Sequence, residues 1–127
     1  MNNIIIPVSI GELFDKVSIL HIKIEKIMDP KKKSDCKNEL EMLNKLFLPY
    51  FAKNKELFSN LKNVNENLWK IEDDIRLKEK RKEFDQKFIQ LARSVYRVND
   101  ERSNIKGQIN SFFGSDIKEV KSYEDYL

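Results

Sequence analysis

The sequence predicts an all-α fold, a bundle of about four helices built from one domain of residues 1–127. Glycine and proline are scarce, with three of each, so most of the usual turn signals are missing. Apolar residues recur every three or four positions over long stretches, which indicates helices with one buried face. Charged residues make up 35% of the chain and alternate in sign, which is typical of the solvated faces of such helices.

The first helix is expected to follow a short extended lead-in. Pro7 would confine any strand there to the edge of a sheet. Ser9 and Glu12 have the spacing of a capping box, in which each side chain accepts from the backbone N–H of the other residue. Apolar residues then follow at helical spacing over 10–28. Pro30 should end the helix at Asp29, because the residue before a proline is driven out of α geometry.

A second helix is expected to begin at Ser34 or Asp35, either of which can act as its N-cap, and to run to about Phe51. Pro49 lies inside the apolar repeat of this helix. Its ring clashes with the preceding turn, so we expect the helix to kink there or to restart.

The third and fourth helices, about 54–80 and 85–114, should pair as a long antiparallel hairpin in the C-terminal half. Each carries one apolar seam in steps of three and four. Asp85 is the expected N-cap of the fourth helix and Gly114 its C-terminal residue. A break at Asn65, acting as a new N-cap, is an alternative for the third helix. The residues after Ser115 have helical spacing and can form a short helix.

Arg102 lies on the apolar seam of the fourth helix, opposite Val64 and Asn65 if the hairpin turns near residue 83. An unpaired buried charge costs several kcal/mol. The arginine should therefore be ion-paired, exposed at a cleft or bound to a ligand. Its candidate partners are Glu66, Asn99 and the carboxylates of the first helix, and both a structural and a ligand-binding role remain open.

Other polar residues gather at the same level of the hairpin. Asp73 is expected near Arg93 across the hairpin, and Arg97 shares a face with Arg93 one turn further along. Two arginines in a cleft can hold a phosphate or carboxylate bidentately; a solvated, ion-paired face is the alternative. The start of the first helix is expected to cover these residues. The candidate ligand-binding residues are therefore Glu12, Lys16, Glu72, Asp73, Arg76, Arg93, Arg97, Asn99, Asp100 and Arg102.

Several classes of function have little support. The pair Glu12 and Asp15 is half of the E-x-x-E/D pattern by which helical pyrophosphatases hold Mg²⁺, but the third helix has no second half, so no metal site is expected. His21 reads as a core or rim residue, and neither a catalytic residue nor a cofactor can be named. Net charge is +3 with interleaved signs, which disfavours nucleic-acid binding. No secretory signal or membrane span is visible, so we expect a cytoplasmic protein.

Several motifs resemble a family of short bacterial and phage proteins of unknown function. They are Ile6-Pro7-Val8-Ser9 with Gly11-Glu12-Leu13 and Asp15-Lys16, Ile71-Glu72-Asp73-Asp74-Ile75-Arg76, Leu91-Ala92-Arg93, Val95-Tyr96, Asn99-Asp100 and Arg102. The resemblance covers most of the chain outside 30–62 and implies no activity. Its polar residues coincide with the candidate cluster.

Two functions follow as hypotheses. The first is a helical binding or assembly module with a polar arginine/carboxylate cleft for an anionic small molecule or partner protein. Such a module is expected to form a homo-oligomer, because the long hairpin offers more seam than one small domain covers. The alternative is a small helical-bundle enzyme acting on a phosphorylated or carboxylated metabolite, with or without Mg²⁺. The sequence leaves open whether the protein is an enzyme.

Overall fold

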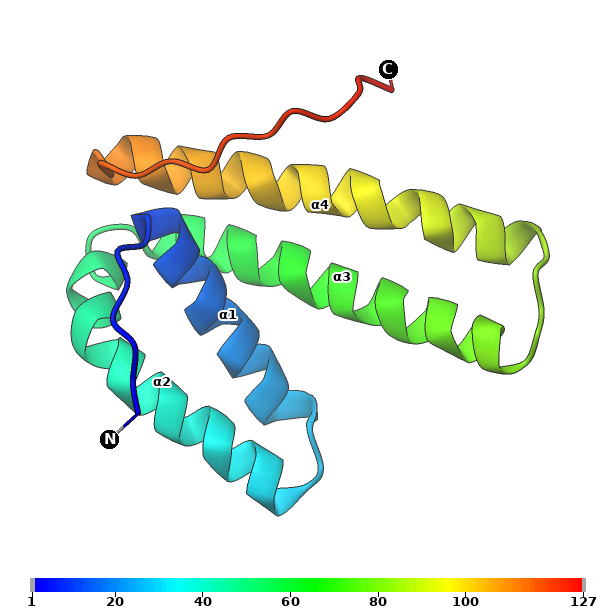
Figure 1. Ribbon diagram of the computed structural model, residues 1–127, viewed down its shortest axis with the longest axis horizontal. Helices are drawn as coiled ribbons and strands as arrows, with labels where there is room; N and C mark the ends of the chain where they lie inside the picture. The colour runs from blue at the N-terminus through cyan, green and yellow to red at the C-terminus, as the bar shows by residue number, and fades with distance from the viewer. Residues whose placement is uncertain (1, 127) are drawn as a thin grey trace.

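The structure is a computed structural model that describes residues 2–126. It contains four helices, α1 (Ile10–Lys26), α2 (Pro30–Phe51), α3 (Lys55–Lys80) and α4 (Gln86–Phe113), and no strand among the described residues. The predicted all-α fold is therefore confirmed. Helices α3 and α4 run side by side over their whole lengths as an antiparallel hairpin, and α1 and α2 cover only one end of it (Figure 1). Helix α1 packs against each of the other three helices.

Side chains from the flanking residues begin three of these helices, and two of the caps, Ser9 and Asp85, are the predicted ones. Ser9 accepts from the Glu12 backbone N–H at 3.1 Å, but the Glu12 side chain does not complete the capping box because it pairs elsewhere. Asn54 begins α3 by accepting from the Leu57 N–H at 3.1 Å. Asp85 begins α4 in the same way, by accepting from the Phe88 N–H at 3.0 Å.

Three boundary predictions were wrong. Helix α1 ends at Lys26, before Met28, which is 90% exposed. Helix α2 begins at Pro30 rather than near Ser34, because Asp29 accepts from the Lys32 N–H and a proline is well suited to the first helical position. The residues after Gly114 form no helix in the described part of the tail.

Helices α2 and α3 both continue through the positions, Pro49 and Asn65, where the sequence suggested an interruption. Helix α2 does not restart at Pro49, and it continues to Phe51, only two residues further along. Helix α3 passes through Asn65 without a break, because the Asn65 side chain bonds to α1 and does not cap the backbone. At the end of α4, Gly114 has a φ of +65°, which is the left-handed geometry expected of a glycine at this position.

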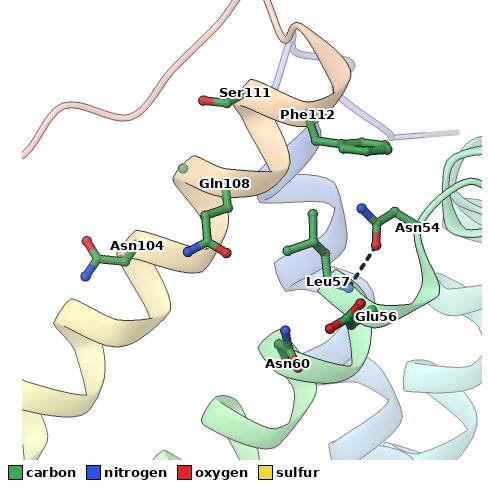
Figure 2. Close-up of a pocket in the computed structure, with 9 residues that line it drawn as sticks. Asn54, Glu56, Leu57, Asn60, Asn104, Gln108, Ser111 and Phe112 are labelled. Atoms are coloured by element: carbon green, nitrogen blue, oxygen red, sulfur yellow. Dashed lines mark hydrogen bonds between the residues drawn. The ribbon is translucent and has the colours of Figure 1, made fainter.

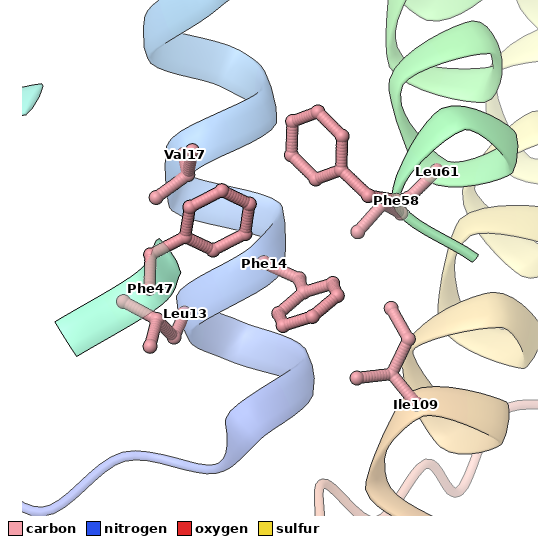
Figure 3. Packing of buried hydrophobic residues seen from close by; sticks show 7 residues of the cluster. All are labelled: Leu13, Phe14, Val17, Phe47, Phe58, Leu61 and Ile109. Carbon is pink, nitrogen blue, oxygen red and sulfur yellow. The ribbon is translucent and has the colours of Figure 1, made fainter. Parts of the chain in front are cut away.

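The hydrophobic core has two unequal parts. The larger one lies where α1 crosses the hairpin, with Phe14 at its centre and Phe47 and Phe58 in edge contact around it (Figure 3). Its other buried members are Leu13, Val17, Leu61 and Ile109. The smaller one lies between α3 and α4 alone and consists of Leu68, Ile71, Leu91 and Val98. These are seam residues that the predicted hairpin register brings together.

Candidate functional site

A largely buried ion pair joins α1 to α4. Arg102 donates from Nε to Oδ1 of Asp15 at 2.9 Å and from Nη2 to Oδ2. The Asp15 side chain is 2% exposed and that of Arg102 is 27% exposed. The hydrogen bonds that Arg102 donates to Asp15 raise the pKa of the arginine above its ordinary value, against the effect of burial. Of the partners considered for Arg102, a carboxylate of the first helix is thus confirmed, as is Asn99, which accepts from Nη1 at 3.4 Å.

Asp15 has further polar partners in α3 and in its own helix. Asn65 donates from Nδ2 to Asp15 Oδ1 at 2.9 Å and to Ser18 Oγ at 2.8 Å. The Ser18 hydroxyl in turn donates to the backbone carbonyl of Asp15 at 2.8 Å. The buried carboxylate therefore accepts three side-chain hydrogen bonds, which offset much of the cost of removing its charge from water.

Lys106, one turn after Arg102, extends this network toward the tail. Its Nζ lies 2.9 Å from Glu12, 2.7 Å from Glu119 and 4.0 Å from Asp15. Burial lowers the pKa of Lys106, but the hydrogen bonds to Glu119 and Glu12 outweigh that effect and raise it. We call these residues the Asp15 cluster: Glu12, Asp15, Asn65, Arg102, Lys106 and Glu119.

The start of α1 is held tightly against the end of α4. The Gly11 N–H donates to Asn110 Oδ1 at 2.6 Å, and the Ile10 N–H donates to Ser115 Oγ at 3.2 Å. A Cβ atom on Gly11 would lie 2.6 Å from the Lys106 carbonyl oxygen. The glycine therefore permits the close approach that brings Glu12 and Asp15 to the cations of α4.

The structure places the other predicted site residues apart from this cluster. Glu72 and Arg76 form an exposed pair at 3.2 Å on α3 and help to line a groove of about 300 Å³. Asp73, Arg93 and Arg97 are exposed and form no ion pair within residues 2–126, so the expected Asp73–Arg93 contact is not formed.

The remaining two candidates also lie outside the Asp15 cluster. Lys16 is exposed next to Asp15 in the sequence. Asp100 accepts from the Tyr126 hydroxyl at 2.6 Å. The ten candidate residues therefore do not line one cleft.

A separate groove of about 1030 Å³ opens between the start of α3 and the end of α4 (Figure 2). Its walls are rich in carboxamides, from Asn54, Asn60, Asn104 and Gln108. Among the described residues that line it, Glu56 alone is charged. None of the Asp15 cluster lines this groove.

Asp15, Asn65, Lys106 and Glu119 were not predicted among the ligand-binding residues, although Asp15 is one of the first-helix carboxylates considered as a partner of Arg102. A signal existed for two of them. Lys106 lies four residues after Arg102 and so falls near the same helix face, and Asn65 lies four residues after Leu61 and three before Leu68 on the seam of α3. Nothing local to the sequence indicates that Glu119, in an irregular segment, reaches Lys106.

His21 is a rim residue, as predicted. Its ring is half-buried and meets the edge of the Phe58 ring at 5.9 Å between centroids. Burial lowers the pKa of His21, and the nearby charge of Lys62 lowers it further. Across residues 2–126, no set of three or more His, Cys, Asp or Glu side chains is placed to share a metal ion. No helix in that range has the length and apolar character needed to span a bilayer.

Comparison with known proteins gives one result. No curated protein and no solved structure matches the chain. A family model described as "Family of unknown function (DUF6165)" matches residues 4–127, which is nearly the whole chain. The protein therefore belongs to the DUF6165 family, whose function is unknown.

Proposed function

We propose that the protein is a helical binding or assembly module that takes an anionic group of a partner protein or small molecule on the basic stretch of α4, residues 86–99. This stretch contains Lys87, Arg93 and Arg97 and no acidic residue. Arg93 and Arg97 lie one helical turn apart, and both are exposed. Two guanidinium groups at this spacing can each grip a carboxylate or phosphate through two hydrogen bonds.

The observation that carries this proposal is that Arg93 and Arg97 form no ion pair within the described residues. On the neighbouring α3, exposed charges neutralise one another four residues apart, as in Lys70 with Asp74 and Glu72 with Arg76. Within residues 2–126, by contrast, neither Arg93 nor Arg97 forms an ion pair. Like charges four residues apart destabilise a helix by about 0.2–0.5 kcal/mol. An incoming anion would relieve that repulsion.

Arg102 has a different role in this proposal. Asp15 already occupies its guanidinium group, and the three carboxylates of the Asp15 cluster are paired with three cations, Arg102, Lys106 and Lys121. An added anion would have to compete with Asp15 for the guanidinium group. We therefore assign the Asp15 cluster to holding α1 on the hairpin, and the anionic contact to Arg93 and Arg97.

Fluorescence anisotropy with a labelled glutamate-rich peptide tests the proposal. The wild-type chain should bind the peptide, and binding should weaken as NaCl is raised, because the contact is exposed to screening. The double variant Arg93→Glu with Arg97→Glu should lose at least tenfold in affinity. Lys32→Glu with Lys37→Glu is the matched control, since it makes the same change in net charge on exposed positions of α2. Equal losses of affinity in both double variants would show that net charge alone causes the effect, and would refute the proposed site.

A further inference from the structure

The irregular tail, residues 115–126, runs back along α4 (Figure 1). Between the tail and α4 lies a pocket of about 450 Å³. Three of the four tyrosines of the chain line it, and the Asp15 cluster contributes none of its described lining residues. We call it the tyrosine pocket and define it by Tyr96 and Asp100 of α4 with Tyr123, Glu124 and Tyr126 of the tail.

We propose that the tyrosine pocket binds a methylated ammonium group, whose positive charge is spread over its methyl groups. Such a cation is attracted to the negative faces of aromatic rings, and it gives up less hydration on leaving water than a free ammonium does. The site is separate from the proposed anion contact, because neither Arg93 nor Arg97 lines the pocket.

Two of the tyrosine rings form a corner of the pocket. The ring centres of Tyr96 and Tyr126 lie 4.9 Å apart, and the ring planes meet at 70°. Tyr96 is 41% and Tyr126 48% exposed, so part of each side chain remains uncovered. Two rings set at a large angle can both contact a single cation, which is how aromatic cages hold quaternary ammonium groups.

Two carboxylates add negative charge to this corner. Asp100 is half-buried and accepts from the Tyr126 hydroxyl at 2.6 Å. In the part of the chain that the structure describes, neither Asp100 nor Glu124 forms an ion pair. A carboxylate that is partly shielded from water attracts a cation more strongly than a fully solvated one. Both carboxylates are therefore available to an incoming cation.

Lys121 also lines the pocket, but its charge already has a partner. Its Nζ lies 3.4 Å from Glu119, which is not among the described lining residues. The same Nζ lies 5.2 Å from the centre of the Tyr123 ring. A tyrosine of the pocket thus already holds a cation by the kind of contact that we propose for the ligand. An anionic ligand, by contrast, would have to compete with Glu119 for Lys121.

Proton NMR titration with choline tests the inference. The methyl protons of choline should shift upfield when the wild-type chain is added, because a ring shields the protons that lie over its face. An uncharged alcohol of the same shape, with carbon in place of the nitrogen, should bind roughly tenfold more weakly. Tyr96→Leu should lose roughly the same factor in choline affinity, whereas Tyr96→Phe, which keeps the ring, should bind choline as the wild type does.

A second pair of variants tests the role of the carboxylate. Asp100→Asn should weaken choline binding. Asp116→Asn is the matched control, since it makes the same change in net charge at an exposed position of the tail that does not line the pocket. This control should bind choline as the wild type does. A peptide that carries trimethyllysine identifies the source of the group: tighter binding of the peptide than of choline assigns it to a partner protein, and the reverse order to a small molecule.

Circular dichroism must show native helix content for each variant. A chain that binds neither choline nor the peptide overturns the inference, and so does equal affinity for the uncharged alcohol. Equal losses in Tyr96→Leu and Tyr96→Phe, or in Asp100→Asn and Asp116→Asn, would also contradict it. The variant Arg93→Glu with Arg97→Glu should not weaken choline binding, so failure of the proposed anion site can be told apart from failure of this one.

Discussion

Arg102 of α4 grips the carboxylate of Asp15 in α1 through two nitrogens, although the two residues are 87 positions apart in the chain. The contact lies where α1 crosses the hairpin, beside the main core around Phe14. Arg102 is thus ion-paired between two helices, whereas Arg93 and Arg97 are exposed on the surface of α4.

Replacing the buried acid should destabilise the protein strongly. Asp15→Asn keeps the shape of the side chain but leaves Arg102 without its countercharge. Breaking a buried pair at one end typically costs about 3–5 kcal/mol. We expect a loss near the lower figure, since Arg102 is partly exposed and Asn retains one acceptor. Urea unfolding followed by circular dichroism measures it.

The control for this variant is Asp35→Asn. Asp35 also pairs with a cation, Lys31 at 2.6 Å, but both side chains are more than half exposed. An exposed pair contributes only about 0–1 kcal/mol. A similar loss of stability in both variants would contradict the structural role that we assign to the Asp15 cluster.

Two glycines offer a matched test of the contact between α1 and α4. Gly11→Ala would place a Cβ atom 2.6 Å from the Lys106 carbonyl oxygen, so α1 must shift away from α4. Overpacking of this kind costs about 1–3 kcal/mol. Gly107→Ala meets no atom within 4 Å, and alanine in a helix is favoured over glycine by about 0.5–1 kcal/mol. Thermal melts should therefore move in opposite directions; a lower midpoint for both variants, or for neither, would argue against the close approach.

Stability should depend on pH through His21. Burial, followed by the charge of Lys62, lowers the pKa of this histidine in the folded protein below its ordinary value of 6.5. Below pH 6.5 the unfolded chain therefore binds the proton more readily, and the free energy of unfolding falls as the pH drops toward the folded pKa. Urea titrations at pH 7.5, 6.5 and 5.5 should show this decline. His21→Gln should flatten it over the same range, and an unchanged decline in the variant would show that other groups cause it.

Much of the fold can be predicted from the sequence because its signals are local. The caps at Ser9, Asp85 and Gly114 each act within one helical turn, and the seams of the hairpin set which residues meet. The start of α2 was misplaced for a physical reason. Pro30 can read as the end of one helix or as the first residue of the next, and the Asp29 side chain selects the second.

Less of the candidate site than of the fold could be predicted from the sequence. An arginine on an apolar seam indicates a buried partner, but the identity of that partner depends on the angle at which α1 crosses the hairpin. That angle is set by packing of the rings around Phe14 and by the close approach at Gly11, which no spacing in the sequence reports. Asp73 and Arg93, which were expected near each other across the hairpin, form no ion pair within residues 2–126, since equal levels on a hairpin do not ensure that two side chains point toward each other.

The exchange of arginine Nε–H protons with water, followed by NMR, tests the division of the arginines most directly. In a dilute sample of the wild-type chain at low temperature, the Nε–H of Arg102 should exchange much more slowly than those of Arg93 and Arg97, because it alone among the three is held by a buried carboxylate. The Arg93 and Arg97 protons should become protected when the glutamate-rich peptide is added, while that of Arg102 should not change. Fast exchange at Arg102, or protection confined to Arg102 with the peptide bound, would contradict this account.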